Sequence, residues 1–278
     1  MQKLDSVAAL QEFVKSQRAA DKSISFVPTM GALHEGHIDL VRRGLHMADI
    51  CIPYIFLNPT QFAPSEDLAA YPKTLDADLK MFEAAGAQAV YLPRADEVYP
   101  NGPEVTHTVE GISQPLEGEF RPQMFGGVAT VLARMFDHAK PDVALFGEKD
   151  YQQLQVIRQL VKNLKLPIRI IGVPTVRDER GLALSSRNAY LTKEQYKVAT
   201  SLNSVLYDMG VRFHSGDSIR DVEIWAHEQL LKEGFESVDY AVIRDAETLL
   251  SVTEKTKELR ALAAVKIGKA RLIDNMPV

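Results

Sequence analysis

The feature that most constrains the fold is an unbroken apolar run, ICIPYIFL, at residues 50–57. Its hydrophobicity is continuous instead of alternating, which is typical of a strand in a parallel sheet that is covered on both faces. A largely polar segment, NPTQF, follows at 58–62. Open α/β sheets bind ligands at the carboxyl ends of their strands, so this run predicts a buried sheet with a ligand beside residues 58–62.

An earlier segment has the pattern strand, turn, helix. Residues 24–27 (ISFV) predict a short strand, and apolar residues recur with helical spacing from about residue 38 to residue 47. Between them lies PTMGALHEGH, residues 28–37. The first N–H groups of a helix have no intrahelical partner and favour an anion, so this turn is predicted to bind phosphate.

The glycines and histidines of this turn indicate which reactions it could serve. Gly31 and Gly36 would let the backbone come close to a ligand, because neither carries a Cβ atom. His34 and His37 lie three positions apart, and two imidazoles beside an anion site suggest phosphoryl or nucleotidyl transfer. Paired histidines can also bind zinc or serve as capping and packing residues, but the HExxH spacing is absent here.

The first 175 residues alternate between β and α patterns, as a Rossmann-like, doubly wound parallel sheet does. After residue 57 we predict a loop at 63–72, helices at 74–85 and about 150–164, and strands at 89–92, 105–109, 143–146 and 168–173. With 278 residues the chain is long enough for two domains, which we place at 1–175, binding nucleotide and substrate, and 176–278.

The second domain is expected to be a small α+β lid. A loop at 176–191 precedes a capping box at Thr192–Gln195, which begins a helix towards Met209. A second helix at about 217–232 and strands at 238–243 and 262–267 follow, and the chain closes with RLID at 271–274.

Composition excludes several classes of partner. A net charge of −5 and a pI near 5.8 favour neither nucleic acid nor an anionic membrane surface. Residues 1–23 read as an amphipathic helix instead of a signal core, and no run approaches the roughly 20 apolar residues of a membrane span. The single cysteine, Cys51, lies in the apolar run and is expected to be a core residue. We therefore expect a cytoplasmic protein.

Two further segments offer positive charge locally. Gly147–Asp150 (GEKD) is a second predicted turn between a strand and a helix, and Lys149 lies in it, where its charge would favour an anion. A solvated surface lysine and an ordinary helix cap would give the same sequence pattern. Leu184–Asn188 (LSSRN) offers two hydroxyls and a guanidinium, which can clamp a triphosphate or form a plain polar turn. The charged run Arg177–Arg180 is interpreted as solvated and is left out of the site.

Four motifs, PTMGALHEGH, IFLNPTQF, FGEKDYQQL and LALSSRN, occur in this order and spacing, and the chain ends in RLIDN. Together they closely resemble the pantoate–β-alanine ligase family of the HxGH nucleotidyltransferase superfamily, nearly end to end. The resemblance implies an ATP-dependent condensation of pantoate with β-alanine through pantoyl adenylate, with release of pyrophosphate and AMP. It also implies Mg²⁺ and a homodimer.

The resemblance assigns roles by motif. Catalysis would fall to His37, His34, Lys149 and Arg187. ATP would be held by Pro28, Met30, Gly31, Ala32, Leu33, His34, Glu35, Gly36, His37, Gly147, Glu148, Lys149, Asp150, Val176, Leu184, Ser185, Ser186 and Arg187. Gln61 would bind pantoate and β-alanine, Gln153 would bind pantoate, and Asn58 would help. Because the carboxylate of pantoate is the nucleophile, the two serines would be phosphate ligands and not a hydrolase centre.

The sequence departs from the family pattern at two positions. Met124 stands in RPQMFGG where the family has histidine, and Thr60 stands where NPMQF has methionine, next to Gln61. Two other functions also fit parts of the pattern. A nucleotidyltransferase with a stable adenylated product would need only the HxGH turn, and a nucleotide-binding regulator would bind ATP without turnover.

Overall fold

The computed structural model describes residues 1–62 and 74–278, so the loop predicted at 63–72 lies outside the described residues. These residues form two compact units. The first comprises Met1–Glu148 and Gln153–Pro174, and the second comprises Lys149–Gln152 and Thr175–Val278. The domains predicted at 1–175 and 176–278 remain a prediction. None of the described helices is long and apolar enough to cross a membrane.

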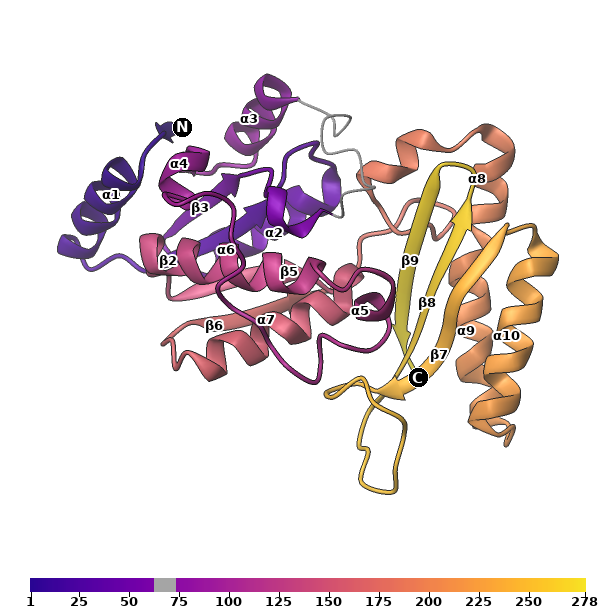
Figure 1. Cartoon of the computed structure of the whole chain (residues 1–278). Helices are drawn as coiled ribbons and strands as arrows, with labels where there is room; N and C mark the ends of the chain where they lie inside the picture. The colour runs from indigo at the N-terminus through magenta and orange to yellow at the C-terminus, as the bar shows by residue number, and fades with distance from the viewer. Residues whose placement is uncertain (63–73) are drawn as a thin grey trace. The chain divides into compact units, whose positions relative to one another are not determined.

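The first unit is built on a six-stranded parallel sheet, as the apolar run at 50–57 predicted (Figure 1). Its strand order is β1-β4-β3-β2-β5-β6. The strands are β1 (Gln2–Leu4), β2 (Ile24–Thr29), β3 (Ile50–Ile55), β4 (Ala89–Tyr91), β5 (Val143–Gly147) and β6 (Arg169–Val173). The chain winds outward from β2 in one direction and from β5 in the other, so the topological switch point, where such sheets bind ligands, lies between these neighbours.

Helices cover both faces of this sheet. They are α1 (Val7–Ala19), α2 (Glu35–Met47), α3 (Leu75–Ala84), α4 (Ala95–Val98), α5 (Glu117–Phe120), α6 (Met124–Ala139) and α7 (Tyr151–Asn163). Phe26 of β2 belongs to a core cluster with α1, α6 and α7, whereas its neighbour Val27 belongs to a separate cluster with α2 and α3. Successive side chains of one strand are thus buried on opposite faces, which explains the unbroken apolar runs.

The Pro- and Gly-rich segment before residue 127 differs from the prediction. The strand predicted at 105–109 is wrong, because the N–H groups of Thr106 and His107 both donate to Oγ1 of Thr130, at 3.0 Å each. Thr130 lies on α6, a helix that the sequence did not reveal. Eleven of its 16 residues are buried, and Gly126 and Gly127, which are poor helix formers, lie in its first turn and conceal its start in the sequence. Strand β1 was also missed.

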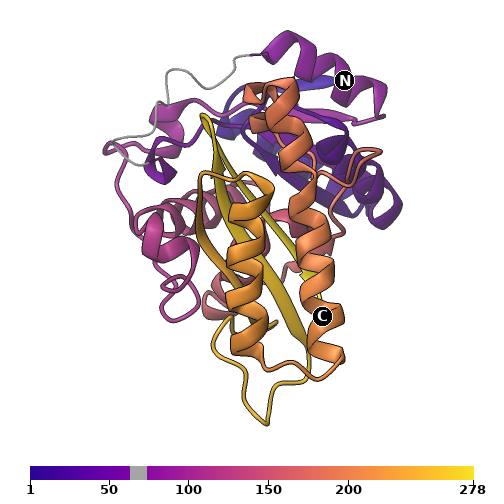
Figure 2. The same cartoon turned by 90° about the vertical axis from the view of Figure 1, so that its right-hand side faces the viewer.

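The second unit is a three-stranded antiparallel sheet, β7-β8-β9, with helices on one face (Figures 1 and 2). Its elements are α8 (Lys193–Ala199), α9 (Ser201–His214), α10 (Ile219–Glu233), β7 (Ser237–Asp245), β8 (Leu259–Ile267) and β9 (Ala270–Pro277). The capping box is confirmed: Thr192 Oγ1 accepts from Gln195 N at 3.2 Å and Gln195 Oε1 accepts from Thr192 N at 3.0 Å. The predicted helix that follows is divided at Thr200, and the closing RLID belongs to a third strand.

The contact between α6 and the short 3-10 helix η1 (Pro59–Gln61) depends on Gly127. A Cβ atom at Gly127 would lie 2.4 Å from the carbonyl carbon and oxygen of Thr60. Backbone cannot yield as a flexible side chain does, so a methyl group here must displace η1 or α6.

We therefore expect Gly127→Ala to destabilise the protein by about 1–3 kcal/mol, measured by calorimetric unfolding. Gly210→Ala in α9 is the matched control, because a Cβ atom there meets nothing closer than 3.9 Å. That variant should be neutral or stabilised by up to about 1 kcal/mol. Equal stability of the two variants would contradict the packing described here.

Candidate functional site

The turn after β2 has a conformation suited to an anion. Gly31 has a φ of +83° and Ala32 a φ of +50°, so the backbone curls through the left-handed region before the helix begins. Helix α2 starts at Glu35 with His34 as its N-cap residue, three residues earlier than predicted. Gly36 and His37 therefore belong to the first helical turn, in which the N–H of His37 donates to the carbonyl of His34 at 2.9 Å.

A buried carboxylate holds this turn in place. Asp78, on α3, is 2% exposed. Its Oδ1 accepts from the N–H of Leu33 at 2.9 Å, and its Oδ2 accepts from the N–H of Ala32 at 3.0 Å and from Thr74 Oγ1 at 3.0 Å. Hydrogen bonds to a charged acceptor are the stronger kind. The sequence placed Asp78 in the first turn of α3 but gave no sign that it fixes the 28–37 turn, because nothing local connects the two segments.

The two histidines stack. Their ring centroids are 4.1 Å apart, and the backbone N–H of His34 donates to Nδ1 of His37 at 3.2 Å. Because Nδ1 accepts, the neutral ring of His37 carries its proton on Nε2. The His34 backbone thus fixes the orientation of the His37 ring.

The segment after β3 carries a network of amide and hydroxyl groups. Asn58, 1% exposed, accepts at Oδ1 from Tyr99 Oη (2.6 Å) and Thr60 Oγ1 (3.0 Å) and donates from Nδ2 to Gln61 Oε1 and the Gly127 carbonyl, both at 3.1 Å. Burial raises the pKa of Tyr99, so the phenol remains a neutral donor. The departure at Thr60 therefore adds a hydroxyl that helps to orient Asn58.

This network also locates Gln61. The Asn58 amide fixes the carbonyl end of the Gln61 side chain, and Gln61 Nε2 donates to the sulfur of Met30 in the preceding turn. Met30, Asn58 and Gln61 are thus brought together within the first unit. Asn58 is enclosed by protein groups, so its effect on a substrate would pass through Gln61. Gln153 lies on α7.

Lys149 and the 176–187 segment belong to the second unit. Strand β5 ends at Gly147, and the 3-10 helix η3 (Glu148–Asp150) leads into α7. Lys149 has a side chain that is 17% exposed, and its Nζ lies 3.3 Å from Asp150 Oδ1. Val176 and Leu184 are joined by a backbone hydrogen bond of 2.9 Å, and Ser185 caps the 3-10 helix η4 (Ser186–Tyr190) by accepting from Arg187 N at 3.3 Å.

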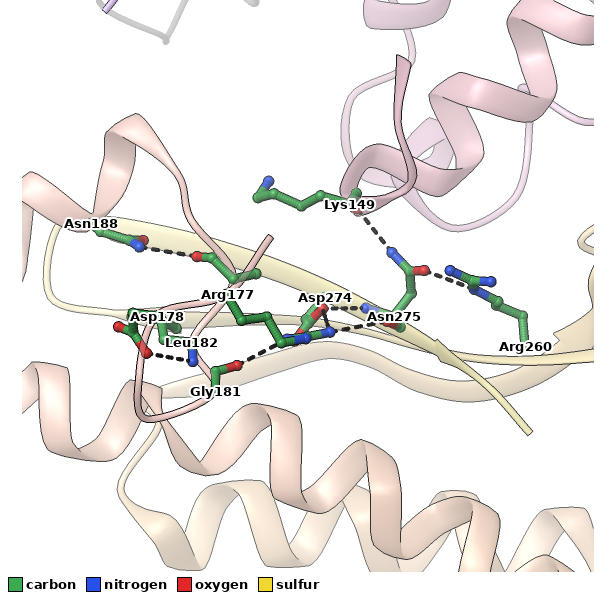
Figure 3. Close-up of polar contacts among 10 residues, drawn as sticks. Lys149, Arg177, Asp178, Gly181, Leu182, Asn188, Arg260, Asp274 and Asn275 are labelled. Atoms are coloured by element: carbon green, nitrogen blue, oxygen red, sulfur yellow. Dashed lines mark hydrogen bonds and ion pairs between the residues drawn. The ribbon is translucent and has the colours of Figure 1, made fainter. Parts of the chain in front are cut away.

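The prediction that Arg177–Arg180 is a solvated run is wrong for Arg177. Its guanidinium forms a two-point ion pair with Asp274, at 2.6 and 2.9 Å, and donates to the carbonyl of Gly181 at 3.0 Å (Figure 3). The side chain of Asp274 is only 2% exposed. A buried carboxylate requires a cation or hydrogen-bond donors, and the aspartate that follows two apolar residues in RLID was the signal in the sequence.

Asp178 closes the turn that follows Arg177. Burial raises the pKa of Asp178, but hydrogen bonds from Tyr196 Oη (2.7 Å) and from the N–H groups of Arg180 and Leu182 outweigh it and hold the pKa below its ordinary value. The same hydrogen bond to Asp178 raises the pKa of Tyr196. Asp178 therefore stays ionised at neutral pH and shapes residues 176–184 into a hairpin-like turn.

A parallel sheet with a histidine-bearing, amide-lined turn at its switch point defines a nucleotide-binding α/β protein. Residues 2–277 match the family model described as pantoate-beta-alanine ligase. The chain belongs to the pantoate–β-alanine ligase family, as its four motifs predicted.

The chain is similar to known members of this family over its whole length. It is 47% identical over 273 residues to pantothenate synthetase of Paramagnetospirillum magneticum, covering 98% of this chain and 96% of that protein. It resembles the crystal structure of pantothenate synthetase from Thermus thermophilus with a TM-score of 0.90 at 41% identity, over 99% of each chain. It also resembles the pantoate–β-alanine ligase of Francisella tularensis complexed with β-γ ATP and β-alanine, with a TM-score of 0.83 at 31% identity, over 100% of this chain and 97% of that one.

The carboxylate of Asp78 leads to a prediction. In Asp78→Asn one oxygen becomes an NH₂ group that faces a backbone N–H, so we expect a loss of about 1–3 kcal/mol in stability and weaker binding of ATP. Asp76→Asn is the matched control, because Asp76 lies exposed in the same helical turn. It should change stability by no more than about 0.5 kcal/mol. Urea unfolding and ATP titration measure both, and an Asp78→Asn protein that binds ATP normally would contradict this role.

Proposed function

We propose that this chain joins pantoate to β-alanine at the expense of ATP, through a pantoyl-adenylate intermediate. The observation that carries the proposal is the 28–37 turn, whose backbone is fixed by Asp78 and whose His37 ring is oriented by the N–H of His34. Preorganised donors are the usual means by which enzymes stabilise charge that develops on phosphate. Membership of the ligase family, over nearly the full chain, supports the choice of substrates.

The reaction has two steps. A carboxylate oxygen of pantoate attacks the α-phosphorus of ATP, the bond to the β-phosphate oxygen breaks, and pyrophosphate leaves with the electron pair. The amine of β-alanine then attacks the acyl carbon, loses a proton, and expels AMP with the oxygen that bridged carbon and phosphorus. No protein nucleophile takes part, so the protein acts by positioning the reactants and stabilising charge.

Positive charge and N–H donors would serve the first step. We propose that the ATP-binding residues are Pro28, Met30 to His37, Gly147 to Asp150, Val176 and Leu184 to Arg187. Among them His34, His37, Lys149 and Arg187 would meet the charge that grows on the phosphates. Such charge must be cancelled because a carboxylate has to approach a polyanion.

Neutral amides would serve the substrate acid. Gln61, oriented by Asn58, can donate to or accept from the hydroxyls of pantoate, and we assign it to β-alanine as well. Gln153 would contact pantoate. Asn58, which the network encloses, would act by holding Gln61.

Magnesium would arrive with the nucleotide. Among residues 1–62 and 74–278 no group of three or more His, Cys, Asp or Glu side chains is placed to hold a metal ion. Mg²⁺ is commonly bound through substrate phosphates together with water. We therefore propose that it is carried by the phosphates of ATP, where it would neutralise charge on the leaving pyrophosphate. A cytoplasmic location and a homodimer complete the proposal.

The proposal is tested by isotope exchange. Labelled pyrophosphate should enter ATP only when pantoate is present, and AMP should be released only when β-alanine is added. Exchange without pantoate, or a nucleotidylated end product in place of AMP, would favour a different nucleotidyltransferase. ATP binding without any turnover would favour a regulator and would contradict the proposal.

Single substitutions test the assigned charges. We expect His37→Ala and Lys149→Ala each to lower turnover by about 10²–10³ or more, because each removes a donor that acts on the transition state. His46→Ala is the control, since His46 lies in the last turn of α2, at the opposite end from the anion-binding turn. Steady-state rates at saturating substrate measure the effect. A loss below about threefold would place His37 or Lys149 outside the mechanism.

A further inference from the structure

Strand β9 carries two adjacent polar residues that are buried in the second unit. Asp274 and Asn275 are each 3% exposed. Burying a carboxylate or a carboxamide is costly unless its hydrogen bonds are made inside the protein. The hydrogen-bond partners of these two residues therefore show which parts of the chain strand β9 holds in place.

Asn275 holds the backbone beside Lys149. Its Nδ2 donates to the carbonyl oxygen of Lys149 at 2.9 Å, and its Oδ1 accepts from Arg260 Nε at 2.8 Å (Figure 3). Arginine only donates, so Arg260 fixes which end of the amide faces Lys149. Arg260 is itself 8% exposed and lies over the ring of Tyr151, 4.0 Å from its centre. The carbonyl of Lys149 is thus held by an amide that cannot turn around.

Asp274 holds the base of the turn that leads to Leu184. It pairs with Arg177 at two points, and Arg177 also donates to the carbonyl of Gly181. Arg177 and Ala183 face each other as an isolated antiparallel bridge, and Asn188 Nδ2 donates to the carbonyl of Ala183 at 3.0 Å. The ion pair therefore fixes the segment from which residues 184–188 extend.

Neighbouring residues of a strand point to opposite faces of the sheet. Asp274 lies opposite Ala263, which belongs to the core beneath the helices, and Asn275 lies opposite Leu262. The two adjacent residues of strand β9 therefore act on opposite faces of the sheet: Asn275 holds the Lys149 turn on one face, and Asp274 holds the Arg177 turn on the other. Figure 3 shows the side chain of Lys149 extending from its turn, away from Asn275.

We propose that Asp274 and Asn275 are positioning residues for the nucleotide reaction. Through strand β9 they keep the Lys149 ammonium and residues 184–187 at a fixed spacing while charge develops on the phosphates. A misplacement of about 1 Å in a reacting group can cost about 100-fold in rate, so buried residues that touch no substrate can control turnover. This inference rests on the proposed roles of Lys149 and residues 184–187 in ATP binding.

A double-mutant cycle tests the positioning role of Asn275. We expect Asn275→Ala to lower kcat by about 10- to 100-fold, and to cost less than about threefold in a Lys149→Ala background, where the group that it positions is missing. Asn275→Asp, which has the same shape, should be as damaging as Asn275→Ala, because it places an acceptor against the Lys149 carbonyl. Equal losses from Asn275→Ala in both backgrounds would overturn the proposal, since a purely structural role does not depend on the ammonium group.

The positioning role of Asp274 can be tested against a second buried ion pair in the same sheet. Asp239 and Arg271 form an ion pair of 2.7 Å with side chains 9% and 21% exposed, against 2% and 21% for Asp274 and Arg177. We expect Asp274→Asn to lower kcat at least about 10-fold and Asp239→Asn less than about threefold, with comparable losses in Tm. Equal effects on kcat would overturn the role of Asp274.

Hydrogen exchange separates this inference from the proposed function. Asn275→Ala should speed amide exchange at residues 149–152 and Asp239→Asn should not, whether or not the enzyme turns over. Unchanged exchange in Asn275→Ala would overturn the inference alone. A wild-type protein without pantoate-dependent exchange of pyrophosphate would contradict the proposed function, and a fully active Lys149→Ala variant would contradict both.

Discussion

The structure of the first unit depends on one carboxylate. Asp78 is removed from water and accepts from two successive backbone N–H groups of the turn after β2. These hydrogen bonds hold the backbone where Gly31 and Ala32 adopt the left-handed conformation. The negative charge of Asp78 is directed at backbone donors upstream of α2. The proposed phosphate site would use N–H groups that follow these donors, at the start of the helix.

The second unit follows the same physical rule with different residues. There, too, buried polar side chains are retained because they fix backbone segments: Asp274 and Asn275 act on the Arg177 and Lys149 turns as Asp78 acts on the 28–37 turn. Buried charges and amides add little net stability over apolar residues of similar size. Their value lies in the geometry they impose. Preorganisation of this kind is what a reaction without a protein nucleophile requires, because positioning and electrostatics must then supply the rate enhancement.

Much of this could be predicted from the sequence, and the failures have a physical pattern. The parallel sheet followed from the unbroken apolar run at 50–57, and the turn between β2 and α2 followed from the strand-to-helix pattern around Gly31 and His37. Helix α6 was missed because Gly126 and Gly127, two poor helix formers, lie in its first turn. Asp78 and Arg177 were missed because their partners lie 45 or more positions away along the chain. Local patterns reveal elements and turns, whereas the residues that hold turns in place are known only once the chain is folded.

If the carboxylate of pantoate attacks the α-phosphorus of ATP, one of its oxygens must leave with the nucleotide, and isotopic labelling can follow that oxygen. Pantoate labelled with ¹⁸O in both carboxylate oxygens is converted with ATP and β-alanine, and the products are weighed by mass spectrometry. In an acyl adenylate the bridging oxygen comes from the carboxylate and leaves with the nucleotide. We expect one ¹⁸O atom in each AMP and one in each pantothenate. Unlabelled AMP, or label in inorganic phosphate released together with ADP, would contradict it.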